Sequence, residues 1–340
     1  MKAIRRAALY SVLPLALILA AGYSWYRLSD TGKGWRYEDK LATYCDGLIP
    51  YKESAVFTGL NTEISLAYDV RHGYGDDSYN YCKVADMEMT IALIDDDAVG
   101  SGLGAAEVFE NLQSGTSDHP PVALGGGWYG YTDMLDTAVV LSCDNKPASI
   151  IVSIAGDESH ENPSEAQAMG ELAAATARKA ADRWSCQAEY GGRIPKVSRP
   201  SMDSPSSATG TCDGIPIDND LQIDWVKAAE GSGATPLEAC VLGEYGANEE
   251  ALYHLEAAFG PYAQRLRSSA DEPDALNAGT GVSNHMARAT AACPGAPRAI
   301  FSIYATEYAY PQKNFLITAL RAFAERSAAR HGCTDLKLPS

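Results

Sequence analysis

Short sequence motifs that identify catalytic or cofactor sites are missing from this chain. The glycine-rich residues 100–104 do not have the spacing of a dinucleotide-binding loop. Residues 281–285, Gly-Val-Ser-Asn-His, lack the last glycine of the elbow that holds a hydrolase serine. The acidic residues at 95–97 and 218–220 lack the alternating oxygens and the later glutamate of a calcium loop. The sequence therefore predicts no catalytic residue and no cofactor, and a hydrolase that acts on wall material is kept as an alternative.

Histidines with the spacing of metal ligands are missing too. None of the six histidines forms a paired pattern, and the cysteines stand where disulfides are expected instead. The sequence therefore predicts no metal site. The histidines are His72, His119, His160, His254, His285 and His331.

Positive charge is scarce beyond the N-terminal region. The formal net charge is −17, and residues 1–40 hold seven basic and three acidic groups, so the remaining 300 residues carry −21. An excess of this sign repels the phosphates of nucleic acids. We therefore expect no nucleic-acid partner, and we attribute the acidity to solubility or, alternatively, to a cationic partner.

Residues 7–26 contain no charged side chain. At helical rise, twenty residues match the roughly 30 Å of bilayer hydrocarbon, and Tyr23, Trp25 and Tyr26 lie at the far end, where aromatic rings favour the interface. We expect a signal anchor over residues 1–28, which contacts the cytoplasmic membrane through residues 7–26, and a juxtamembrane linker over residues 29–40. The alternative is a signal peptide cleaved near the small residues 20–22. No cysteine lies near the end of the run, which excludes a lipoprotein anchor.

All eight cysteines lie beyond this run. Basic residues flank both of its ends, so the charge bias alone does not set the orientation. An even number of cysteines spread over two regions is typical of an oxidising compartment. We therefore expect a single-pass protein of the cell membrane with the bulk of the chain outside the cytoplasm.

The cysteine spacing indicates that one domain occurs twice. The first four cysteines are separated by 37, 61 and 43 residues, and the last four by 28, 53 and 40. Each gap shrinks by the length of a loop, and the order is kept. We therefore expect four-cysteine domains at residues 41–190 and 212–338, joined by an exposed linker rich in proline and serine at residues 191–211. The cysteines are Cys45, Cys82, Cys143, Cys186, Cys212, Cys240, Cys293 and Cys333.

Local matches support the same alignment of the two copies. Cys-Asp-Gly opens each copy, and proline and isoleucine follow the third cysteine at identical offsets. An arginine stands three residues before each last cysteine. The matching pairs are Pro147 with Pro297, Ile150 with Ile300, and Arg183 with Arg330.

The secondary-structure pattern of each copy predicts strands followed by a closing helix. Strands are expected at 87–94, 137–142 and 148–155 in the first copy and at 299–305 in the second. Ser164 is the expected helix cap, with Gln167 completing a capping box, and the second helix is expected at about 312–331. The fold class is therefore α+β, with two tandem antiparallel sheets, each closed by a C-terminal helix, after one transmembrane helix. The inner face of the first helix is expected to contain Met169, Leu172, Ala173, Thr176, Ala180 and Trp184. That of the second helix is expected to contain Leu316, Ala319, Leu320, Phe323 and Ser327.

The direction of these elements predicts the cysteine pairing. Cys143 ends a strand at a turn, the next strand runs away from that turn, and about twenty helical residues return roughly 30 Å to it. Cys186 therefore reaches Cys143, and Cys333 reaches Cys293 by the same argument. Elimination then pairs Cys45 with Cys82 and Cys212 with Cys240. The alternative pairs Cys45 with Cys186 and Cys82 with Cys143.

Three features carry a resemblance to a known group of proteins. They are the Cys-Asp-Gly-x-x-Pro start at Cys45, the Tyr-Cys-Lys-Val strand at residues 81–84, and an alanine-rich helix that ends in a cysteine. With these features the chain resembles a group of uncharacterised actinobacterial membrane-anchored cell-envelope proteins with a duplicated four-cysteine domain. The resemblance implies a compartment and no activity.

Aromatic residues between glycines at 125–131 are the most unusual stretch. Trp128, Tyr129 and Tyr131 are candidates for a ligand or glycan platform, although a strand that packs Trp128 is the plainer interpretation. The expected function is a non-enzymatic binding or structural module of the envelope, whose partner is an unknown envelope protein or wall component. The alternative is a small-ligand sensor or carrier that uses the stretch around Trp128.

Overall fold

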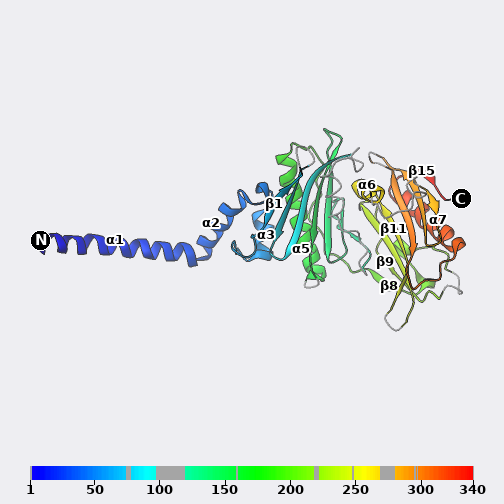
Figure 1. Cartoon of the computed structure of the whole chain (residues 1–340), viewed down its shortest axis with the longest axis horizontal. Helices are drawn as coiled ribbons and strands as arrows, with labels where there is room; N and C mark the ends of the chain where they lie inside the picture. The colour runs from blue at the N-terminus through cyan, green and yellow to red at the C-terminus, as the bar shows by residue number, and fades with distance from the viewer. Residues whose placement is uncertain are drawn as a thin grey trace.

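The computed structural model places most of the chain in a long N-terminal helix followed by two antiparallel sheets, each with one long helix (Figure 1). The side chains of residues 2–13 and 265–268 lie outside the description, as do the expected glycine loop at 100–104 and the acidic residues at 218–220. The structure describes residues 2–73, 78–96, 119–157, 160–217, 222–246, 249–268, 280–294, 296 and 298–339.

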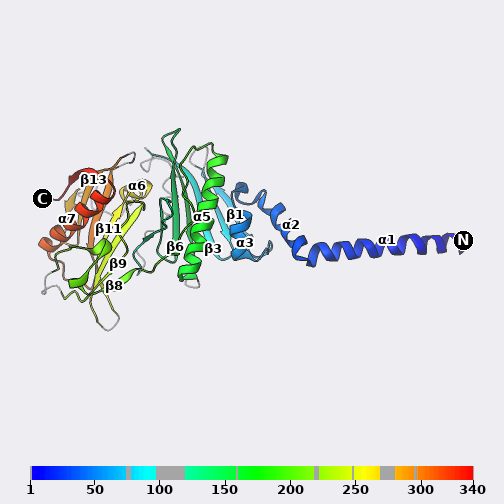
Figure 2. The same ribbon diagram turned by 180° about the vertical axis from the view of Figure 1, so that it is seen from behind.

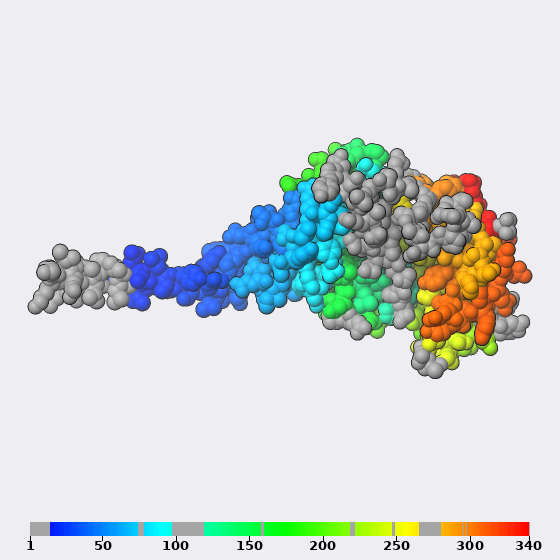
Figure 3. Space-filling model, in the orientation of Figure 1, coloured from blue at the N-terminus to red at the C-terminus, as the bar shows by residue number. Residues whose placement is uncertain are grey.

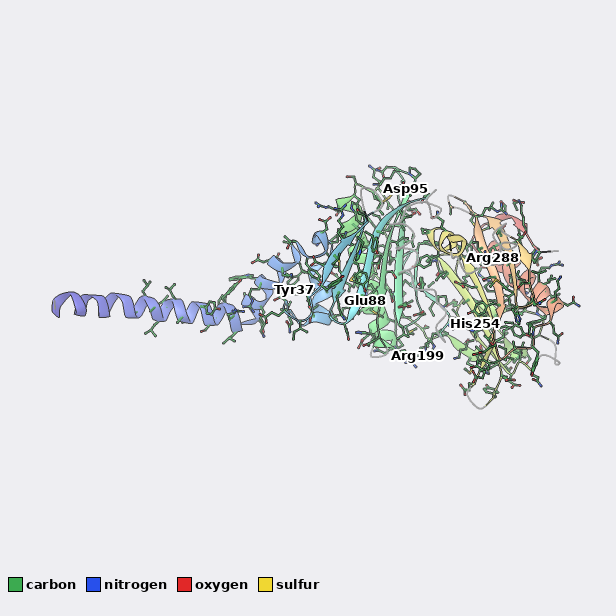
Figure 4. The ribbon with its side chains drawn as sticks, viewed as in Figure 1. Tyr37, Glu88, Asp95, Arg199, His254 and Arg288 are labelled. Carbon is green, nitrogen blue, oxygen red and sulfur yellow. A yellow bond between two sulfur atoms is a disulfide. The ribbon has the colours of Figure 1, made fainter. Side chains whose placement is uncertain are left out.

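Two helices precede the first sheet. Helix α1 (Lys2–Leu28) is followed by α2 (Asp30–Leu41). The side-chain oxygen of its N-cap, Ser29, accepts a hydrogen bond of 3.0 Å from the backbone amide of Gly32. Tyr37, labelled in Figure 4, is fully buried and donates its hydroxyl to Ser54 at 2.8 Å. The expected juxtamembrane linker is thus a helix that packs into the core of the first half.

The side chains of α1 are described from Pro14 onward. Among the described residues, no helix is long and apolar enough to cross a membrane. The anchor expected at residues 7–26 begins before that point and stays a prediction.

The first sheet has seven strands in the order β1-β2-β3-β7-β6-β5-β4, all antiparallel. Helix α5 (Pro163–Arg183) packs on one face, and the short α3 (Tyr51–Thr58) contacts α5. A 3-10 turn, η1 (Tyr44–Gly47), carries the first cysteine. The strands are β1 (Asp69–His72), β2 (Tyr79–Val84), β3 (Met87–Asp95), β4 (Val122–Ala123), β5 (Gly130–Thr132), β6 (Asp136–Ser142) and β7 (Ala148–Ala155).

The second sheet has eight strands in the order β12-β13-β14-β11-β10-β9-β8, with β15 paired to β13. Helix α7 (Lys313–Arg330) packs on it, and α6 (Pro261–Ser268) follows β11. The strands are β8 (Ser201–Asp203), β9 (Trp225–Ala228), β10 (Leu237–Gly243), β11 (Ala251–Ala258), β12 (Gly281–Val282), β13 (Met286–Ala292), β14 (Ala299–Ala305) and β15 (Thr334–Lys337).

The two sheets share one strand order. Cys82 on β2 and Cys240 on β10 fix the correspondence, which then matches β1-β2-β3-β7-β6-β5 with β9-β10-β11-β14-β13-β12. Each series is followed by a long helix that ends close to the last cysteine. This architecture is consistent with two tandem copies. Strands β4 and β8 are additions at the sheet edges, and β15 is an addition that pairs with β13.

The expected match of Ile150 with Ile300 is wrong by one residue. Ile150 packs in the core beneath α5, whereas Ile300 lies in the layer between the sheets. Leu141 pairs with Ile150 and Ala291 with Ala299, so the hairpin turn after the third cysteine is one residue shorter in the second copy. Because side chains alternate along a strand, a shift of one residue moves Ile300 to the opposite face.

The faces of the two sheets that turn away from their helices share an apolar layer. Tyr79, Ile94, Tyr131 and Val140 of the first sheet cluster there with residues of the second. Figure 2 shows α5 across the strands of the first sheet and α7 across those of the second. The order of layers is therefore helix, sheet, sheet, helix. The contributions of the second half are Leu237, Ala258, Tyr262, Ala263 and Ile300.

The segment at 191–211 is less exposed than its composition predicts. Ile194 and Val197 are buried in the core of the first half. Ser201–Asp203 forms the edge strand β8, and Thr211 is buried, with its hydroxyl donating to the carbonyl of Ala239. The prolines and serines do predict irregular backbone, but the interspersed apolar residues attach it to both halves.

The N-cap of helix α5 lies two residues earlier than expected. Asn162 is the N-cap, and its Oδ1 accepts the amides of Ser164 at 3.2 Å and Glu165 at 3.0 Å. Pro163 occupies the first helical position, where its missing N–H costs no hydrogen bond. The expected Ser164–Gln167 capping box is therefore wrong. The expected inner faces are confirmed for both helices, since all their residues are buried except the partly buried Trp184.

Four disulfides join the eight cysteines in the pairing that the direction of the elements predicts. Cys45 bonds to Cys82 and Cys143 to Cys186 in the first half, and the described residues contain no free cysteine. The second half repeats this order with Cys212–Cys240 and Cys293–Cys333. Each half therefore has one bridge from its entry turn to the sheet and one from the end of its closing helix.

Candidate functional site

A cavity of about 260 Å³ opens between the two sheets, beside the end of β3. Asp95, labelled near the top of Figure 4, ends this strand, and the next residue, Asp96, lies on the cavity wall. Both halves contribute walls, so the cavity exists only where they meet. The first half provides Asp96, Tyr129, Val140, Ser142 and Ser149, and the second provides chiefly Phe259, Pro261, Pro294 and His331.

A glycine turn positions Tyr129 on this wall. Gly125, Gly126 and Gly127 have φ angles of 70°, 65° and 82°, a region that side chains disfavour. At Gly126 a Cβ atom would lie 2.4 Å from the carbonyl oxygen of Arg193, so only glycine fits. The chain then enters β5, and the carbonyl of Tyr129 accepts the amide of Val140 at 2.9 Å. Tyr129 is thus held at the boundary of the two halves.

The three aromatic candidates do not form one platform. Trp128 is buried in the first core and donates its indole N–H to the carbonyl of Gly192 at 2.7 Å. Tyr131 is fully buried between the sheets, edge-on to Tyr262 at 5.6 Å between ring centres. Only Tyr129 lines the cavity. Alternation along the chain explains the outcome, because it turns Trp128 toward one face and the two tyrosines toward the other.

The hydroxyl of Tyr129 stays protonated at ordinary pH. Burial is the main cause that raises the pKa of this phenol, and the nearby Glu238 and Tyr262 raise it further. A neutral phenol both donates and accepts hydrogen bonds. Tyr129 therefore offers an aromatic face and one polar atom at the cavity.

A buried ionic cluster lies behind the cavity wall in the second half. Glu238 on β10 is 1% exposed and accepts hydrogen bonds from Ser327 Oγ at 2.6 Å and from Arg330 Nη2 at 2.6 Å and Nε at 3.0 Å. Burial alone would raise the pKa of this carboxyl. The hydrogen bonds from His331, Arg330 and Ser327 outweigh burial and hold the pKa below its usual value. Glu238 is therefore charged at neutral pH.

His331 connects this cluster to the cavity. Its Nε2 lies 3.3 Å from Glu238 Oε1, and its ring stacks on Phe259 with 3.5 Å between ring centres. The ring is nearly buried and contributes to the cavity lining. A change in the charge or position of Glu238 would therefore affect the cavity wall through its direct contact with His331.

The residues at the matching positions of the first half do not repeat this cluster. Asn80 stands two residues before Cys82, at the place that Glu238 has before Cys240. Arg183, which matches Arg330, pairs instead with the partly exposed Asp46 at 2.9 Å. The buried ion pair of Glu238 and Arg330 is therefore not repeated at the matching positions of the first half.

Sequence reasoning missed Glu238, Phe259 and His331. A glutamate inside the apolar run of β10 is the one signal that could have indicated a buried charge. Phe259 and His331 carry no such signal, because their importance comes from contacts between segments that are distant in the sequence.

The arrangement suits a small molecule that has both an apolar face and hydrogen-bonding groups. Tyr129, Phe259 and His331 supply aromatic surface, while Ser142, Ser149 and Asp96 supply oxygen atoms. Ser149 already donates its hydroxyl to Asp96 Oδ1 at 3.0 Å, which fixes that carboxylate at the rim.

No protein-family model matches this chain, and no curated protein or solved structure matches it either.

Proposed function

We propose that this chain is a membrane-anchored, extracytoplasmic binding or structural module of the cell envelope. The observation that carries the proposal is the uncovered apolar surface of α1. Leu15, Leu17, Ile18 and Leu19 are between 57% and 67% exposed. Figure 3 shows this part of the chain as a narrow extension from a bulky body. Apolar side chains in such a position gain stability from an apolar surrounding, and a bilayer supplies one.

The disulfides support the same compartment. All eight cysteines form disulfides, and such bonds are typical of oxidising environments such as the cell exterior. The resemblance to actinobacterial envelope proteins agrees with this location and stays a prediction. An envelope protein or a wall component is the partner that we propose, because α2 holds the first half close to the point where α1 would enter the membrane.

Protease treatment of spheroplasts tests the topology. We expect the protease to digest the two domains, and α1 to remain in the membrane fraction with its original N-terminus. A mature protein that is free in the medium and begins near Tyr23 would contradict the anchor. Protection of the domains until the membrane is lysed would contradict the extracytoplasmic location.

A second candidate function is the binding of a small ligand, because Tyr129 does line a cavity between the two halves. The cavity can be narrowed from its rim without a change in the cores, since Ser142 is exposed there. Ser142→Phe is therefore a suitable variant, and Ser207→Phe, at an exposed serine outside the cavity lining, is its matched control.

Thermal unfolding with N-acetylglucosamine and with phenol tests this candidate. A ligand that binds only the folded state raises the Tm. We expect a rise with at least one of the two probes for the wild-type protein and for Ser207→Phe, and no rise for Ser142→Phe. An equal rise in all three proteins would place binding outside the cavity, and no rise in any would count against a ligand of either class.

A further inference from the structure

A second group of polar side chains lies at the opposite side of the first half from the cavity described above, beneath the α5 N-terminus. Asp86 belongs to the tight turn between β2 and β3, and Asp157 and His160 belong to the connection from β7 to α5. One ligand atom from each of these three residues lies within 4.8 Å of the others. The two aspartates are exposed, while His160 is 7% exposed.

The ring of His160 is held at both nitrogens. Its Nδ1 lies 2.6 Å from Glu165 Oε2, and its Nε2 lies 2.9 Å from Asp86 Oδ1. Phe57 contacts the ring edge-on at 6.1 Å between ring centres. A carboxylate on Nδ1 fixes the ring orientation and the tautomer that leaves Nε2 as the metal-binding atom. Metal-bound histidines in proteins have this second partner almost always.

Contacts of the described backbone position these side chains. Ala85 has a φ of 57°, which closes the turn that presents Asp86. The amide of His160 donates to the carbonyl of Asp157 at 3.0 Å, which keeps these two residues together. Glu165 stands in the first turn of α5, where Asn162 caps its amide. Arg199, labelled in Figure 4, donates to the carbonyl of Glu161 at 3.2 Å and supports the same connection.

We propose that Asp86, Asp157 and His160 form a site for a divalent transition-metal cation of the zinc class, with Glu165 as the positioning residue behind the histidine. Bonds of about 2.0–2.2 Å from zinc to nitrogen and to oxygen, in the tetrahedral arrangement that zinc favours, place two ligand atoms about 3.3–3.6 Å apart. His160 Nε2 and Asp86 Oδ1 lie 2.9 Å apart, so the two side chains need to separate only slightly to bind one ion.

The donor set selects among the cations. Imidazole nitrogen favours zinc and its neighbours over calcium and magnesium, which prefer oxygen alone. Thiolates do not compete, because the eight cysteines are in disulfides. The metal replaces the proton between Nε2 and Asp86, so binding releases this proton to solvent, while the other proton stays on Nδ1 and is donated to Glu165. The exposed aspartates leave room for water to complete the coordination.

Calorimetric titration of the full-length protein in detergent with zinc chloride tests the site. We expect one equivalent to bind. Asp86→Asn and Asp157→Asn remove a charged ligand from an exposed position, so the variants keep the fold, and each should weaken zinc binding at least tenfold. Glu165→Gln should weaken it about 10–100-fold, as loss of such an outer carboxylate does in other sites. Cobalt(II) as a probe should show the visible absorption of a nitrogen- and oxygen-bound ion in the wild-type protein, and this absorption should be lost or weakened in the two aspartate variants.

Glu161→Gln is the matched control. It removes a carboxylate next to His160 that pairs with His119 at 2.9 Å and does not belong to the cluster. Zinc affinity should be unchanged in this variant. The proposal is overturned by the absence of a one-equivalent zinc site, by wild-type affinity in either Asp86→Asn or Asp157→Asn, or by calcium that binds as tightly as zinc.

Discussion

Loss of both disulfides from the second half should unfold that half at neutral pH. The change is Cys→Ser at residues 212, 240, 293 and 333. The bridges close loops with sequence separations of 28 and 40 residues, for which restriction of the unfolded chain amounts to about 3.5–4 kcal/mol each. The combined loss of about 7 kcal/mol is comparable to the whole stability of an ordinary domain, which is about 5–15 kcal/mol. Urea unfolding and limited proteolysis measure the effect.

The single-bridge variant Cys212→Ser/Cys240→Ser is the graded control. It should keep the fold and lose about 3–4 kcal/mol of unfolding free energy. Dithiothreitol reduces the bridges of both halves, so it should destabilise the wild-type protein at least as much as the four-cysteine change does. A fully reduced protein that keeps the wild-type urea midpoint would contradict the prediction.

The second large effect is expected at Arg330. Arg330→Gln leaves Glu238, which is 1% exposed, with Ser327 and His331 but without its bidentate cation. Removal of one partner of a buried ion pair costs about 3–5 kcal/mol, and we expect about 3 kcal/mol because two partners remain. Urea unfolding at neutral pH measures this loss. Addition of Glu238→Gln to the variant should recover part of it, because no charge is then buried.

The pH dependence of this effect has a definite sign. The pKa of Glu238 is lowered in the folded protein, so its contribution to stability is complete above the unfolded pKa of about 4.3 and is lost as the pH falls through the folded pKa. Without Arg330 the opposing influence of burial raises this pKa. The difference between the wild-type protein and Arg330→Gln should therefore shrink as the pH is lowered below about 4.

Arg183→Gln is the matched control from the first half. Arg183 pairs with Asp46, and the side chains of the two residues are 58% and 31% exposed. Exposed pairs of this kind contribute about 0–1 kcal/mol. A loss at Arg183 as large as that at Arg330, or a loss at Arg330 that grows in acid, would show that burial of Glu238 is not the cause.

Features that depend on neighbours along the chain could be predicted from the sequence. β7 and β14 were predicted with their bounds as observed, because each is a short β-branched run between turn residues. The long closing helices follow from apolar residues at helical spacing. The direction of a strand and its following helix was enough to pair Cys143 with Cys186.

Features that depend on how the sheets meet could not be predicted. Residues of β7 and β10 are buried on both faces, so their sequences do not alternate between apolar and polar residues. Without alternation, the sequence does not show which face turns to the helix, and Ile300 was matched to the wrong position for this reason. The cavity at Tyr129 and the contacts of His331 arise only from this packing.

The burial of both faces of each sheet also restricts where variation and recognition can occur during evolution. A partner that approaches the protein meets loops, strand edges and the backs of α5 and α7, and it does not meet the flat surface of a central strand. Substitutions that alter recognition are therefore tolerated at those places, whereas substitutions in the layer between the sheets must be matched by both halves at once. Each half thus has a permanent neighbour that constrains how far its own sequence can change.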